Sequence, residues 1–62
     1  MKTKMLETIE LLVAADVNYI TKNDLEDAYK TDHNETCPDW LISWAVAYID
    51  NNYWRSVHVL NF

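Results

Sequence analysis

The chain has 62 residues, half of them apolar, and carries ten acidic side chains against five basic ones, for a formal charge of −5. A chain of this length forms one small domain, here spanning 1–62, and buries a smaller fraction of its surface than a larger protein does. The acidic balance argues against binding to a nucleic-acid backbone or an anionic membrane, because contacts with phosphates require Lys or Arg.

Apolar residues at helical spacing predict a first helix over 4–15. Thr3 is the expected N-cap of this helix, and Asn18 is a candidate for the residue that closes it. Asp16 falls within the apolar stripe, so the helix either ends between Ala15 and Val17 or turns this carboxylate toward a partner, and the end is favoured. The expected buried stripe consists of Met5, Leu6, Ile9, Leu12 and Val13.

A short second helix is predicted over 24–30. Either Thr21 with Asp24 or Asn23 with Glu26 can form a capping box at its start, since a short side-chain oxygen accepts from the free amides of the first turn. The buried side chains of this helix are expected to be Leu25, Ala28 and Tyr29. Three acids are expected in its first turn, where the helix dipole favours negative charge: Asp24, Glu26 and Asp27.

The polar segment 31–36 is the predicted loop, and a third helix follows over 38–52. Thr36 is the expected N-cap, and Pro38 is tolerated because amides of the first turn have no partner within a helix. The third helix is apolar around most of its circumference, so it must be covered from more than one side. In the tail 53–62, the β-branched stretch 57–60 could be a short strand, but Tyr53, Val57 and Leu60 also recur at helical spacing. A helical continuation or an extended arm is favoured, since no second strand is evident elsewhere.

The predicted fold is therefore all-α, a small three-helix domain with a short C-terminal arm. Residues 37–62 hold 16 apolar side chains, including all three tryptophans, but only three charged ones. Full burial of one such side chain is worth about 1.5–3 kcal/mol, and a short monomer covers so many of them poorly. We expect a homodimer, with another protein docked on the same surface as the alternative. The expected interface residues are Trp40, Leu41, Trp44, Tyr48, Trp54 and Val57.

One loop cluster, His33, Glu35 and Cys37 with Asp32 beside them, raises the possibility of a metal site. Zinc sites normally use four ligands in two spaced pairs, whereas this cluster contains the single cysteine of the chain. A solvated loop leading into a helix is therefore favoured over a metal site. A catalytic thiol would need a base, an oxyanion hole and a substrate cleft, for which the chain has hardly any room. We expect Cys37 to be a small buried apolar residue, and we expect neither a cofactor nor enzymatic activity.

The acids Asp24, Glu26 and Asp27 are interpreted first as a solvated helix face. The alternative is a surface that attracts a basic protein partner, or that imitates DNA phosphates and so inhibits a DNA-binding protein. A helix-turn-helix regulator that binds nucleic acid is a further alternative. Its recognition helix would begin with Asp39 and Trp40 in place of the residues that normally reach base edges.

Acidic residues such as Glu7 and Glu10 interrupt the N-terminal apolar stretch, which a signal peptide does not tolerate. No apolar run reaches the roughly 18 residues of a membrane span. With a lone cysteine and no export signal, we expect a cytoplasmic protein with no membrane partner.

The sequence begins Met1-Lys2-Thr3-Lys4, lacks glycine and carries an aromatic helix from Pro38 to Trp54. In this general character it resembles the small accessory proteins encoded in the early regions of temperate lambdoid phages. The resemblance implies a regulator or a modulator of a host factor that acts through protein contacts, and it assigns a role to no individual residue. We therefore predict a non-enzymatic regulatory or adaptor protein.

Overall fold

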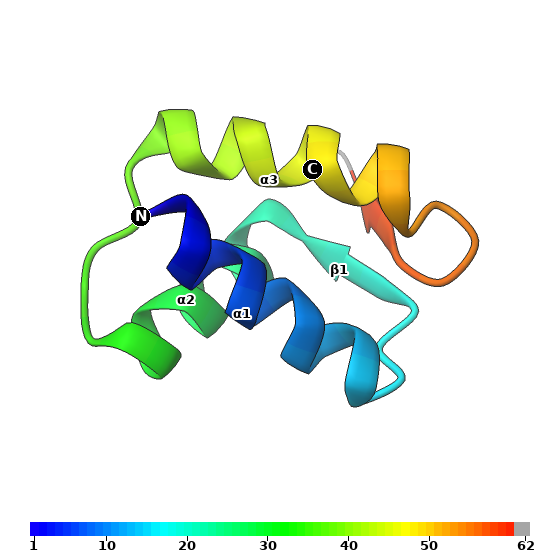
Figure 1. Cartoon of the computed structure of the whole chain (residues 1–62), viewed down its shortest axis with the longest axis horizontal. Helices are drawn as coiled ribbons and strands as arrows, with labels where there is room; N and C mark the ends of the chain where they lie inside the picture. The colour runs from blue at the N-terminus through cyan, green and yellow to red at the C-terminus, as the bar shows by residue number, and fades with distance from the viewer. Residues whose placement is uncertain (61–62) are drawn as a thin grey trace.

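Three helices form the framework of the protein in the computed structural model, which describes residues 1–60. They are α1 (Lys2–Ala14), α2 (Lys22–His33) and α3 (Asp39–Asn52), and each packs against the other two. Helix α3 lies along one side of the molecule, and α1 crosses in front of the remaining elements (Figure 1). The predicted three-helix framework is confirmed. The last two residues of the predicted arm, Asn61 and Phe62, lie outside the described residues.

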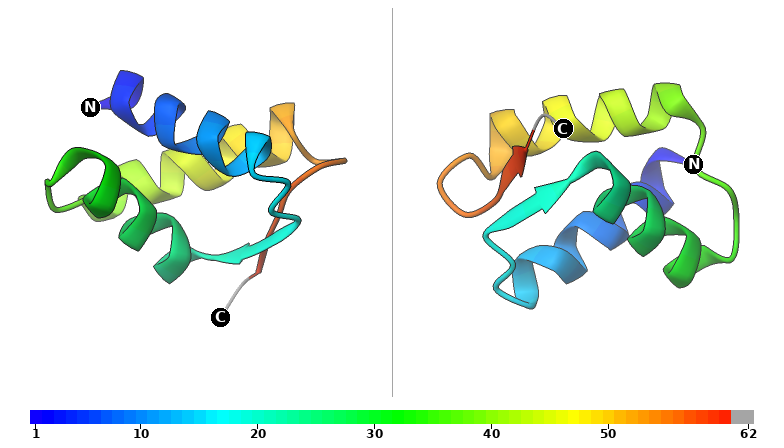
Figure 2. Two further views of the ribbon diagram at one scale, coloured as in Figure 1. Left: turned by 90° about the horizontal axis from the view of Figure 1, so that it is seen from below. Right: turned by 180° about the vertical axis from the view of Figure 1, so that it is seen from behind.

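Two short strands correct the all-α prediction. Strand β1 (Tyr19–Thr21) pairs in parallel with β2 (His58–Leu60), and both views of Figure 2 show the two strands side by side. A further backbone hydrogen bond precedes the paired residues: the amide of His58 donates to the carbonyl of Asn18 over 2.7 Å. The tail is thus a strand that returns to the N-terminal half, and the helical continuation is wrong for 58–60.

The first helix starts and ends differently from the expectation. Met1, and not Thr3, is its N-cap, while the end at Ala14 agrees with the predicted end near Ala15. Asn18 does not close the helix; the reversal into β1 is made instead at Asp16, whose φ of 61° lies in the left-handed region. The chain contains no glycine, and Asp and Asn are the residues that adopt this region at the next lowest cost.

The second helix is longer than predicted at both ends. Thr21 and Asp24 form the capping box. The amide of Asp24 donates to the Thr21 hydroxyl over 3.1 Å, and the amide of Thr21 donates to the Asp24 carboxylate over 2.9 Å. Because the helix begins at Lys22, only Asp24 of the three predicted acids lies in the first turn. The helix continues to His33 and ends on Asn34, which has a left-handed conformation with φ of 53°. The predicted loop is shortened accordingly.

Helix α3 begins without a side-chain cap. Pro38 is the N-cap, and its carbonyl accepts from the amides of Leu41 at 3.0 Å and Ile42 at 3.2 Å. Thr36 therefore does not have the capping role predicted for it. The helix ends at Asn52, as expected.

The core lies between the three helices and the strand pair. Every element except β2 contributes fully buried side chains, and so do Cys37 and Val57, which lie between elements. The buried side chains are Met5, Thr8, Ile9, Ile20, Leu25, Tyr29, Cys37, Leu41, Ile42, Ala45, Ile49 and Val57. One chain therefore covers the inner side of α3 by itself. Two predicted interface residues, Leu41 and Val57, are core residues of the single chain and are not available to a partner in this conformation. Completion of the core does not require a second copy.

Candidate protein-binding surface

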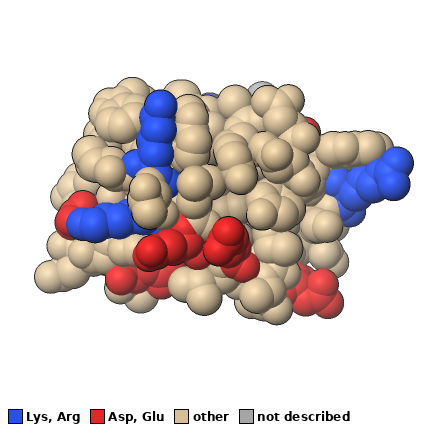
Figure 3. Space-filling model, in the orientation of Figure 1, with Lys and Arg blue, Asp and Glu red and all other residues tan. Residues whose placement is uncertain are grey.

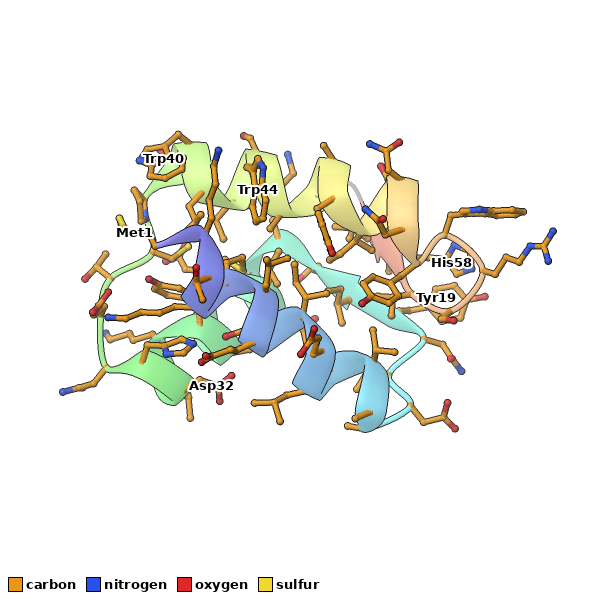
Figure 4. All side chains as sticks on the ribbon, in the orientation of Figure 1. Met1, Tyr19, Asp32, Trp40, Trp44 and His58 are labelled. Carbon is orange, nitrogen blue, oxygen red and sulfur yellow. The ribbon has the colours of Figure 1, made fainter. Side chains whose placement is uncertain are left out.

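A row of aromatic side chains follows the outer side of α3. Trp40, Trp44 and Tyr48 recur every four residues, a spacing that places them on one face of a helix. The Trp40 side chain is 53% exposed, while Trp44 and Tyr48 are half-buried. The rings of Trp44 and Tyr48 stack with centroids 5.3 Å apart. Figure 4 shows both indoles on α3, and Trp44, like Tyr48, also packs against the edge of the core.

Small uncharged residues lie beside the aromatic row. Ser43, Ala47 and Asn51 also recur every four residues, and all three are exposed. Together the two rows form a continuous surface without charge, which we call the α3 strip: Trp40, Ser43, Trp44, Ala47, Tyr48 and Asn51. Figure 3 shows a broad tan surface over α3 that is crossed by one basic side chain.

Exposed charged side chains lie on α1 and along one edge of α3. Helix α1 carries two acids, Glu7 and Glu10, and two lysines, Lys2 and Lys4, and Figure 3 shows acidic and basic side chains together over this helix, beneath α3. On α3 itself, Asp39 and Asp50 are about three helical turns apart and therefore share one face of the helix. Both aspartates are exposed, and neither forms an ion pair with a residue that the structure describes.

One basic residue adjoins the strip. The ammonium group of Lys2 lies over the ring of Trp44, 5.4 Å from the centroid, which is within the range of a cation–π contact. This contact shows that Trp44 is on the side of α3 that faces α1.

The structure separates the sequence-predicted interface residues into three groups. Trp40, Trp44 and Tyr48 share the strip, whereas Leu41 and Val57 are buried. Trp54 is 55% exposed but lies in the turn after α3, where the guanidinium of Arg55 stacks over it at 4.7 Å.

The predicted acidic partner surface on α2 does not form one continuous set of free carboxylates. Asp24 is engaged in the capping box, Glu26 is half-buried and only Asp27 is both exposed and free of a described hydrogen bond. The pair of Asp39 and Asp50 beside the α3 strip was not predicted, although their spacing of three helical turns is the signal that could have found it.

The loop cluster around His33 is a structural network. Glu35 pairs with Lys4 and accepts from the Tyr29 hydroxyl at 3.2 Å, while His33 Nε2 lies 2.8 Å from the carbonyl of Lys4. The ion pair with Lys4, followed by the Tyr29 hydrogen bond, lowers the pKa of Glu35. Among the residues described, no three His, Cys, Asp or Glu side chains converge on a position for a metal.

The thiol of Cys37 is buried and makes only a long contact of 3.8 Å with the Pro38 carbonyl. Burial raises the pKa of this thiol, and the nearby acids Glu26 and Asp39 raise it further. A thiol with a raised pKa is a poor nucleophile at neutral pH. The expectation that Cys37 is a small buried apolar residue is confirmed.

The described residues enclose no cavity. No helix within residues 1–60 combines the length and apolar character needed to cross a membrane. Comparisons with protein-family models, with curated proteins and with solved structures return no match for this chain. The α3 strip, with its exposed Trp40, is therefore the feature on which a functional assignment rests.

Proposed function

We propose that the protein is a non-enzymatic regulatory or adaptor protein that binds another polypeptide through the α3 strip. The observation that carries the proposal is the exposure of Trp40 next to Trp44 and Tyr48, on a helix whose inner side is already satisfied by the core. Tryptophan and tyrosine are the residues most often found as anchors at the centre of protein interfaces. Trp40 is exposed and Trp44 and Tyr48 are half-buried, so a bound polypeptide would remove further apolar area of all three from water.

The bound polypeptide is either a second copy of the chain or a different protein. A homodimer was expected because the C-terminal half carries so much apolar surface, and the exposed strip is the part of that surface still available to it. The general resemblance to accessory proteins of lambdoid phages favours a host factor as the different protein. This part of the proposal depends on the resemblance alone.

A helix-turn-helix regulator is the rival function, and no observation on α3 favours it. The exposed positions of α3 offer Asp39 and Asp50 where a recognition helix would present basic or amide side chains to DNA. Negative charge at both ends of the helix repels phosphates.

Site-specific photo-crosslinking in cells tests the proposal. A photoreactive residue at Ala47, within the strip, should give defined crosslinked products, whereas the same residue at Thr31, exposed on α2, should not. Co-expression of the chain without the photoreactive residue should suppress the crosslinked products by competition. Co-expression of the Trp40→Ala variant should suppress them less well. Identical products from both positions, or equal suppression by Trp40→Ala, would contradict a role for the strip.

A further inference from the structure

We draw no further inference here: the strongest candidate, the exposed face of α3 around Trp40, is the surface on which the proposed function already rests, and nothing in the structure shows what covers it.

Discussion

The hydroxyl of Tyr29, a fully buried residue of α2, donates a hydrogen bond of 3.2 Å to Glu35 in the loop before α3. The other oxygen of Glu35 pairs with Lys4 of α1, so one carboxylate connects two helices and the loop. We predict that Tyr29→Phe lowers the free energy of unfolding by about 0.5–1.5 kcal/mol, the usual contribution of one such bond. Urea unfolding followed by circular dichroism measures it; a loss well below this range would mean that the bond is not maintained in solution.

The same carboxylate makes stability depend on pH. The ion pair with Lys4 and then the Tyr29 bond lower the pKa of Glu35 below its ordinary value of 4.5. A lowered folded-state pKa adds stability above the unfolded pKa, and this stability is lost as the pH falls through the folded pKa. The melting temperature of the wild type should therefore exceed that of Glu35→Gln at about pH 7, and the difference should shrink towards about pH 3. A difference that does not change with pH would contradict the pairing.

Alkaline pH should act through the partners of Glu35. The carboxylate raises the pKa of Lys4, while burial and then the Glu35 bond raise the pKa of Tyr29. Both shifts favour the protonated group in the folded chain. The stability that they add is therefore complete below the ordinary pKa values, 10.5 for Lys4 and 10.0 for Tyr29, and it is lost as the pH rises through the folded-state pKa values. The Glu35→Gln variant should lose less stability above about pH 10 than the wild type.

Thr8 is fully buried in α1, and its hydroxyl has no hydrogen-bond partner among the described residues. A buried polar group without a partner carries a cost in desolvation. The Thr8→Val variant keeps the shape of the side chain and removes the hydroxyl, so it should stabilise the protein by about 1 kcal/mol and raise the melting temperature by about 4–8 °C. Thr8→Ala is the control, since it removes a methyl group as well and should gain less. A destabilised Thr8→Val would show that the hydroxyl has a partner in solution.

Asn34 ends α2 in the left-handed region, with φ of 53°. Alanine in this conformation costs about 1–2 kcal/mol because of its Cβ, whereas glycine adopts it freely. We predict that Asn34→Ala lowers stability by about 1 kcal/mol and that Asn34→Gly preserves or raises it. Thermal melts of both variants at one pH measure the difference. Equal effects would mean that Asn34 stabilises the helix end through its side chain and not through its backbone conformation.

The helices could be predicted from the sequence because their signals are local. The apolar spacing of Met5, Ile9 and Leu12 and the box of Thr21 with Asp24 both depend on residues within a few positions of one another. Helix ends were less accurate, since Asn34 and Asp16 supply left-handed conformations that glycine usually signals, and the chain has no glycine.

The strand pair could not be predicted in the same way. Each strand has only three residues, and its pairing joins Tyr19 to His58 from opposite ends of the chain. A parallel pair of this length gains stability only when the helices bring its strands together, which is a property of the whole fold.

The candidate surface was partly predictable. The helical spacing of Trp40, Trp44 and Tyr48 identified its anchors, and the structure leaves Trp40 exposed and the other two half-buried. Leu41 was assigned to the same surface because α3 is apolar on nearly every side, and only packing against the rest of the chain decides which side is buried. The contact of Lys2 with Trp44 depends on how α1 packs beside α3, so the sequence of neither helix predicts it.

Amide chemical-shift mapping of the isotope-labelled chain tests the central claim most directly, because each residue reports separately. The chain is titrated with the polypeptide that crosslinks from Ala47 or, if that polypeptide is a second copy, diluted over a range of concentrations. We expect shifts centred on residues 40–51 of α3, together with shifts of the indole signals of Trp40 and Trp44. Shifts centred on α2 around Asp27, or a spectrum that does not change, would contradict the claim.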